Sequence, residues 1–209
     1  MQKWQRRKDE RPAEIMAAAL ALFVSKGFVS TKIDDIAKQA GVSKGTVYLY
    51  YASKEILFKD MVHTLMVPKI NEVETYISTY QGSQLELLKV VIRQWWQTVK
   101  SSGLAGVPKL IISEADNFPD LSRFYVKEVI QRVQSILVKI LRKGIEKNEF
   151  SKIEPALSAR VIMSSLVYFS MWDTSLKKYD QKGLEVDDLI EQQIQLLENG
   201  LVSNAKENI

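Results

Sequence analysis

Residues 31–54 read TKIDDIAKQAGVSKGTVYLYYASK, two short helical stretches separated by a glycine turn. In the first stretch, Ile33 and Ile36 fall on one face at helical spacing. Gly41 can adopt the left-handed backbone conformation that turns a chain sharply after a helix. Ser43 then stands where a side chain can cap the next helix. This order of features predicts a helix-turn-helix motif.

The second helix of the motif, residues 44–50, has an apolar side and a free side. At about 100° per residue, Val47 and Tyr51 lie together and are expected to face the core. On the free side, an ammonium group can donate to guanine O6 or N7, hydroxyl groups can donate to phosphates or base edges, and a glycine lets the backbone approach DNA closely. The residues that offer such groups are Lys44, Gly45, Thr46, Tyr48 and Tyr50.

Two polar residues flank the motif. Thr31 is expected to cap its first helix by accepting a hydrogen bond from a backbone N–H. Lys54 starts the following helix and adds positive charge to a helix N-terminus, which is a favourable place for a phosphate. The same pattern also fits a helical hairpin whose outer face is merely solvated.

Positive charge is concentrated at one end of the 209-residue chain. Lysine and arginine number 29 and aspartate and glutamate 25, a formal net charge of +4. Residues 1–60 hold 11 of the basic and 7 of the acidic residues, so they carry the whole excess. A basic end on a neutral body indicates nucleic acid or an anionic membrane as the partner, although an excess of four can also arise by chance.

Composition argues against catalysis. The chain has no cysteine and a single histidine, His63, which excludes disulfides, thiolate and multi-histidine metal sites, and cysteine nucleophiles. His63 is expected within a helix, without the nucleophile elbow of a hydrolase, and the sequence has no phosphate loop or dinucleotide fingerprint. We therefore expect a protein that is not an enzyme and that needs no metal or cofactor.

Glycines and prolines divide the chain into helical segments, and sustained period-2 alternation is absent from the sequence. The expected fold class is all-α, with a compact three-helix head followed by a larger helical body. No run of about 18 apolar residues indicates a transmembrane helix, and the acids and missing cleavage site near the start argue against a signal peptide and favour a cytoplasmic protein. The nine expected helices are 12–26, 33–40, 44–50, 54–80, 84–101, 105–114, 119–147, 153–176 and 186–202.

Residues 12–60 resemble the DNA-binding domain of the TetR/AcrR family of bacterial transcriptional regulators. The resemblance is dense, and its main departure is Tyr51, where the family usually has phenylalanine. The residues that carry it are Ala18, Leu22, Phe23, Gly27, Phe28, Thr31, Ile36, Ala37, Ala40, Gly41, Val42, Ser43, Gly45, Tyr48, Tyr50, Lys54, Glu55 and Leu57.

The resemblance implies a homodimer of nine or more helices, with a DNA-binding domain at 1–53 and a ligand-binding and dimerisation domain at 54–209. Arg6, Arg7 and Lys8 precede the first expected helix, where a flexible basic arm and a solvated tail are equally consistent with the sequence. The residues that match DNA-contacting positions of relatives are Thr31, Ser43, Lys44, Gly45, Thr46, Tyr48, Tyr50 and Lys54.

The body resembles the family less. Residues 108–125 are weakly similar to the AefR branch. Residues 153–202 are expected to form the dimer contact, because residues 157–172 are apolar nearly all round and the last helix has a long apolar stripe. Aromatic side chains suggest an apolar or aromatic ligand, although core packing is the commoner role for each of them. These ligand candidates are Trp95, Trp96, Phe118, Phe124, Tyr125, Tyr168 and Trp172.

The resemblance implies a ligand-responsive repressor that binds a palindromic operator in double-stranded DNA and is released by a small, largely apolar effector. An activator and a ligand-independent regulator remain open, as does a helical small-molecule-binding protein without specific DNA binding. A helical protein of the membrane surface is disfavoured, because a capped helix after a glycine turn has no use there.

Overall fold

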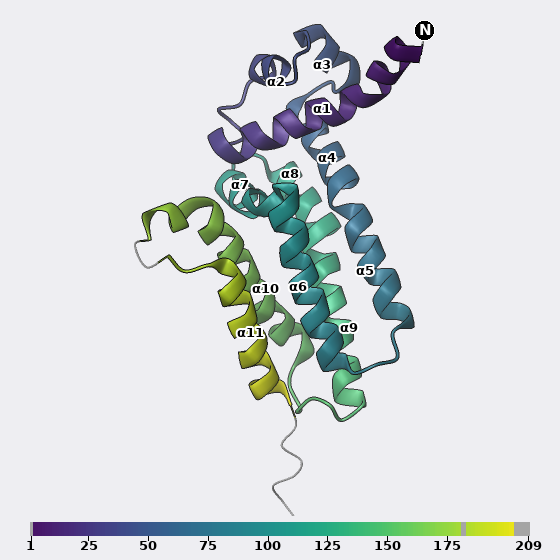
Figure 1. Ribbon diagram of the computed structural model, residues 1–209, viewed down its shortest axis with the longest axis vertical. Coiled ribbons are helices and arrows are strands. Elements are labelled where there is room, and N and C mark those ends of the chain that lie inside the picture. The colour runs from purple at the N-terminus through teal and green to yellow at the C-terminus, as the bar shows by residue number, and fades with distance from the viewer. Residues whose placement is uncertain (1, 181–182, 203–209) are drawn as a thin grey trace, which may run out of the picture. The chain divides into compact units, whose positions relative to one another are not determined.

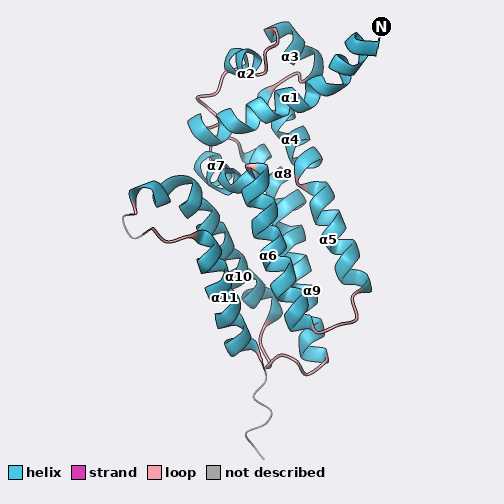
Figure 2. Cartoon of the chain, in the orientation of Figure 1, coloured by secondary structure: helices cyan, strands magenta, loops and turns pink. Residues whose placement is uncertain are grey.

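The computed structural model describes residues 2–180 and 183–202, and this part of the chain is built from helices and loops, with one isolated bridge between Phe150 and Val202 (Figures 1 and 2). The predicted all-α class is confirmed. The α-helices are α1 (Gln2–Lys26), α2 (Ile33–Gln39), α3 (Lys44–Tyr50), α4 (Lys54–Leu65), α5 (Val67–Thr79), α6 (Gln84–Ser102), α7 (Val107–Glu114), α8 (Pro119–Tyr125), α9 (Gln131–Glu146), α10 (Pro155–Met171) and α11 (Val186–Leu201). The shorter segments are the 3-10 turns η1 (Leu104–Gly106) and η4 (Lys177–Tyr179) and the π turns η2 (Val126–Ile130) and η3 (Trp172–Leu176).

Each of the nine expected helical segments is found, and two of them are divided into two α-helices. The segment expected at 54–80 breaks at Met66 between α4 and α5. Pro68 explains the break, because it has no N–H to donate to the carbonyl one turn earlier and is tolerated only in the first turn of a helix. The segment expected at 119–147 contains the π turn η2 between α8 and α9.

The start of the first helix was predicted wrongly. α1 begins at Gln2, and Pro12 lies inside it instead of near its first turn. The proline removes one intrahelical hydrogen bond, which a helix of this length can lose without ending. The backbone of residues 6–8 is therefore part of α1 and does not form an arm before it. Their side chains lie outside the part of the structure that is described.

The chain divides into two compact units. Unit 1 consists of residues 1–68 and 109–126, and unit 2 consists of residues 69–108 and 127–209. Helices α1 to α4 and α8 belong to unit 1, and the long helices α6, α9, α10 and α11 belong to unit 2. The functional boundary at residue 53 stays a prediction.

Four phenylalanine rings form the centre of unit 1. Phe23, Phe28 and Phe58 are fully buried, with ring centroids 5.0 to 6.3 Å apart. Phe118, the residue before α8, places its ring edge-on to Phe28 at 4.8 Å. Aromatic pairs in this geometry add specific attraction to the burial of their surface. Phe28, in the loop that follows α1, is thus held by contacts with three other rings.

Unit 2 is a bundle with an apolar interior. Its buried residues include Leu88 and Ile92 on α6, Ile140 and Leu141 on α9, and Ile162 on α10. Across both units, none of the described helices is long and apolar enough to span a membrane.

Candidate nucleic-acid interface

The turn between α2 and α3 has the geometry that the sequence predicts. Gly41 has a φ of 65°, in the left-handed region. Its N–H donates to the carbonyl of Lys38 at 3.3 Å, and the N–H of Val42 donates to the carbonyl of Ala37 at 2.9 Å. These two bonds form a Schellman motif, which closes the end of α2 and redirects the chain.

The start of α3 is capped by Ser43, as expected. The Ser43 Oγ accepts a hydrogen bond from the Thr46 N–H at 3.1 Å and lies 2.8 Å from the Thr46 hydroxyl. One turn further, Val47 is fully buried, and Tyr51 is almost so. The predicted inward side of this helix is therefore confirmed, and its orientation is fixed at both ends.

Tyr51 departs from the family pattern by one hydroxyl group, and that group has a partner. Burial raises the pKa of Tyr51 to about 12, and the negative charge of Asp60 and a hydrogen bond with its carboxylate act in the same direction. A buried tyrosine needs such a partner for its O–H. The ring thus keeps the place of a phenylalanine in the core.

The opposite side of α3 is open to solvent. Tyr48 is 48% exposed and Leu49 is 74% exposed. Lys44 and Gly45 are also exposed, while Thr46 and Tyr50 are intermediate. We call the surface formed by residues 43–50 on this side the α3 face. It presents a cation, hydroxyl groups and an open backbone position, the groups with which proteins contact phosphates and base edges.

Lys44 is already paired on this surface. Its Nζ donates to Asp34 Oδ2 of α2 at 3.0 Å, and this hydrogen bond and the charge of Asp34 raise the pKa of Lys44. The neighbouring Asp35 points elsewhere and lies 3.8 Å from Lys26. Asp34 was missed from the sequence, because only the turn geometry shows that the second residue of α2 reaches the first residue of α3.

Thr31 does not cap α2, contrary to expectation. Lys32 stands at the cap position, and the buried Thr31 hydroxyl instead donates to the carbonyl of Gly27 at 2.7 Å. Because α2 begins only at Ile33, Thr31 is one residue too early to reach the N–H groups of its first turn.

Lys54 lies beneath the loop that follows α1. Its Nζ donates to the carbonyls of Phe28, Val29 and Thr31 at 2.6, 3.3 and 2.8 Å and lies 4.7 Å from the centre of the Phe28 ring. Burial lowers the pKa of Lys54. An ammonium group has three protons, so these carbonyls account for its donors in this arrangement. The contact with a phosphate stays a prediction.

Three of the seven ligand candidates lie in unit 1. Phe118 packs on Phe28, and the Phe124 ring lies 5.1 Å from that of His63. Tyr125 is buried, which raises the pKa of its hydroxyl. The same segment supplies Glu114, whose Oε1 accepts a hydrogen bond from the Val29 N–H at 3.4 Å. Residues of the predicted effector region thus touch the loop beside the helix-turn-helix motif.

The other four candidates lie in unit 2, in two pairs. Trp95 and Trp96 have ring centroids 6.5 Å apart on α6, and the buried Trp96 donates its indole N–H to Asp187 of α11 at 3.2 Å. Tyr168 and Trp172 have ring centroids 6.1 Å apart, and the buried indole nitrogen of Trp172 has no hydrogen-bond partner among the described residues. Binding of a ligand by any of the seven stays a prediction.

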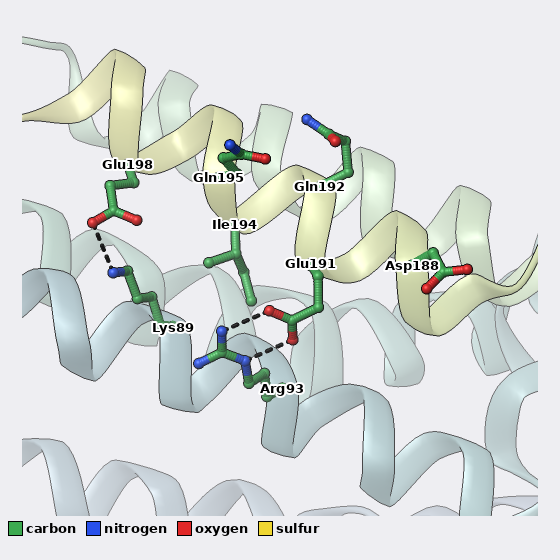
Figure 3. Close-up of a pocket in the computed structure, with 8 residues that line it drawn as sticks. All are labelled: Lys89, Arg93, Asp188, Glu191, Gln192, Ile194, Gln195 and Glu198. Carbon is green, nitrogen blue, oxygen red and sulfur yellow. Dashed lines mark hydrogen bonds and ion pairs between the residues drawn. The ribbon is translucent and has the colours of Figure 1, made fainter.

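Two hollows of unit 2 do not resemble sites for an apolar ligand. The groove between α6 and α11 has a volume of about 360 Å³ (Figure 3). It is crossed by charged pairs: Arg93 donates to both oxygens of Glu191 at 2.7 and 2.6 Å, and Lys89 lies 2.9 Å from Glu198. A smaller cavity between α5, α6 and α9 measures about 70 Å³. None of the seven candidates is among the described residues that line these two hollows.

A capped helix that stands outward from a helix-turn-helix motif, with a cation and hydroxyl groups on its free face, defines a DNA-binding protein. Residues 15–61 match the sequence model of the bacterial regulatory proteins of the tetR family. The chain belongs to the TetR/AcrR family of helix-turn-helix transcriptional regulators. Since this is a family of regulators without enzymatic activity, the expectation that the chain is not an enzyme is confirmed. The likeness of residues 108–125 to the AefR branch stays a prediction.

Relatives extend the similarity beyond the helix-turn-helix motif. The chain is 29% identical over 154 residues to YfiR of Bacillus subtilis, an uncharacterized HTH-type transcriptional regulator, covering 71% of this chain and 72% of that protein. It is 26% identical over 181 residues to the fatty acid metabolism regulator protein of the same organism, covering 85% and 92%. The structure of FadR from Bacillus subtilis in complex with stearoyl-CoA superposes with a TM-score of 0.70 at 23% identity, covering 90% of this chain and 98% of that one. The superposition shows that the two chains share a fold.

Proposed function

We propose that this regulator binds a palindromic operator as a homodimer through the α3 face, and that a small, largely apolar effector releases it. In this proposal it acts in the cytoplasm as a repressor. The exposed α3 face carries the proposal, because a solvated Tyr48 and Leu49 beside a buried Val47 have no evident role in folding. An activator that reads DNA through the same face is the alternative.

Six of the eight predicted DNA contacts lie on the α3 face. Thr31 and Lys54 are the other two, and their side chains are bonded to the loop beside α2. We therefore assign base and phosphate contacts to the α3 face and assign Thr31 and Lys54 the role of holding it in place. The residues that we assign to direct contact are Ser43, Lys44, Gly45, Thr46, Tyr48 and Tyr50.

The surface of α10 and α11 supports the homodimer. Leu157, Val161 and Tyr168 are each more than half exposed and follow one another along one side of α10, with the small Ser164 between them. Leu196 of α11 is equally exposed. Exposed apolar groups in such a row favour a protein partner, and a second copy of the same helices offers matching groups.

Release by an effector is supported by the two chain segments that make up unit 1. Residues 109–126 pack in the same compact unit as the helix-turn-helix motif, through Phe118 on Phe28 and Glu114 on Val29. A ligand that binds one conformation of this segment better than another would favour that conformation, and would thereby change the orientation of α3. To change operator occupancy from 99:1 to 1:99, it must prefer the released conformation by about 5.5 kcal/mol.

The operator is the first thing to test. Selection of bound sequences from a random DNA pool at near-physiological salt is expected to yield a palindromic consensus, whose half-sites are about 34–36 Å apart or a multiple of that distance. Light scattering is expected to give twice the mass of the chain. Binding without a consensus would contradict specific recognition, and a monomeric mass at micromolar concentration would contradict the homodimer.

A fatty acyl thioester is the effector that we propose to test first. The chain is similar over most of its length to a regulator of fatty acid metabolism, and the FadR structure contains stearoyl-CoA. Stearoyl-CoA at micromolar concentration is expected to lower operator affinity at least tenfold, whereas coenzyme A alone leaves it unchanged. Equal effects of the two compounds, or none, would contradict an apolar effector of this class.

A further inference from the structure

We infer that Asp34 is a specificity-determining residue that positions Lys44 for reading a base and keeps it from pairing with phosphates. This inference rests on the proposed binding of an operator through the α3 face. Its basis is the contact of the two side chains, 3.0 Å between Lys44 Nζ and Asp34 Oδ2. The two residues come from different helices and meet at the surface that would face DNA.

The pair has no evident role in the stability of the fold. The side chains of Lys44 and Asp34 are 54% and 59% exposed. Ion pairs as exposed as this one contribute little to folding, because solvent screens the attraction and two long side chains lose freedom. The turn itself is already fixed by the Schellman motif at Gly41 and the cap at Ser43. The pair is therefore better explained by a role in DNA binding.

A carboxylate on a DNA-binding face weakens attraction to the DNA backbone. The affinity for any DNA sequence depends on the number of phosphates that cations neutralise. On this face, the negative charge of Asp34 offsets the positive charge of Lys44. A free lysine is a flexible point charge that pairs with whichever phosphate is nearest. With Asp34 in place, Lys44 is less available to phosphates, and non-specific binding is lowered.

The same carboxylate leaves base recognition possible. The Lys44 ammonium group has three protons, and Asp34 accepts one of them. Two remain for the O6 and N7 atoms of a guanine, the commonest base contact of a lysine or arginine in the major groove. Asp34 thereby restrains the ammonium group at the end of α3 in a position from which it can read a base.

Asp34→Asn tests the inference, because asparagine keeps the shape of the side chain and removes its charge. We expect affinity for random DNA to rise several-fold and the preference for the selected operator to fall about tenfold. The slope of log affinity against log salt should steepen by about 0.9 per half-site, as expected for one more neutralised phosphate. The measurement is fluorescence anisotropy with operator and scrambled duplexes over a range of salt concentrations.

Asp35→Asn is the matched control. Asp35 is the next residue of the same helix, and its carboxylate lies 3.8 Å from Lys26 and does not contact α3. It also accepts a hydrogen bond from the Lys32 N–H at 3.5 Å, which an asparagine oxygen can accept as well. The same change of charge at this position is expected to leave the preference for the operator within twofold of the wild type. A tenfold loss in both variants would show that only the net charge of α2 matters, and would overturn the role given to Asp34.

A double-mutant cycle separates positioning from simple repulsion. Lys44→Ala is expected to remove operator preference, so the readout in that background is affinity for random DNA. There Asp34→Asn should no longer raise this affinity, because the cation that Asp34 restrains is gone. An equal effect in both backgrounds would overturn the inference. Such a result differs from failure of the proposed function, because in that case the wild-type protein itself would prefer no DNA sequence. Unchanged thermal unfolding of each variant confirms that the fold is intact.

Discussion

Tyr48→Ala and Lys44→Ala are each expected to abolish operator-specific binding while leaving the fold intact. Both side chains are about half exposed, so truncation opens no cavity in the core. A good base contact contributes about 1–3 kcal/mol of discrimination. A dimer would lose that contact in both half-sites, about 2–6 kcal/mol, which approaches the ~4–10 kcal/mol that separates specific from non-specific binding.

The measurement compares operator and scrambled duplexes with each variant at fixed salt. Tyr76→Ala is the control, because Tyr76 is exposed to a similar extent on α5 but lies in unit 2. It should bind the operator like the wild type. If Tyr48→Ala and Lys44→Ala also bind it with unchanged affinity, the α3 face is not the recognition surface.

The helix-turn-helix motif could be predicted from the sequence because its signals are local. A left-handed glycine at position 41 and a serine cap at position 43 act over a few neighbouring residues. The burial of Val47 followed from helical spacing alone. The extent of α1 was missed for the opposite reason: Pro12 reads as a helix start, yet a helix can continue through a proline when its other residues favour it.

The contacts that depend on tertiary structure could not be predicted from the sequence. Asp34 and Lys44 are ten residues apart, and only the angle of the turn brings them together. The contact of Glu114 with Val29 joins segments that are 85 positions apart. Residue type alone makes the seven aromatic side chains candidates, and it does not say whether a ring such as Phe118 lines a cavity or packs on another ring.

Lys54 shows how the structure changes a prediction made from the sequence. The residue was expected to bind a phosphate, and Lys54→Ala would then weaken binding to all DNA and lower the salt slope by about one. In the structure the ammonium group instead joins three carbonyls of the loop at residues 28–31. The two roles make different predictions for a variant that keeps the side-chain length and removes the charge.

Lys54→Met is therefore expected to lower the free energy of unfolding by about 2–4 kcal/mol. Each hydrogen bond from a charged donor is worth about 1.5–3 kcal/mol, and the loss of three at once is less than their sum because burial of the ammonium group carries its own cost. For a chain of this length, that loss lowers the unfolding temperature by about 5–15 °C. Thermal unfolding followed by circular dichroism measures it.

Lys38→Met provides the comparison, because Lys38 is exposed on α2 and its loss should leave the unfolding temperature within about 2 °C of the wild type. If Lys54→Met unfolds like the wild type and binds all DNA more weakly with a smaller salt slope, the phosphate contact is the correct role. If it unfolds earlier, and its DNA binding at low temperature keeps the wild-type salt slope, Lys54 acts on DNA only by holding the loop beside α2 and α3. We expect the second result, because three carbonyl oxygens lie within 3.3 Å of Lys54 Nζ.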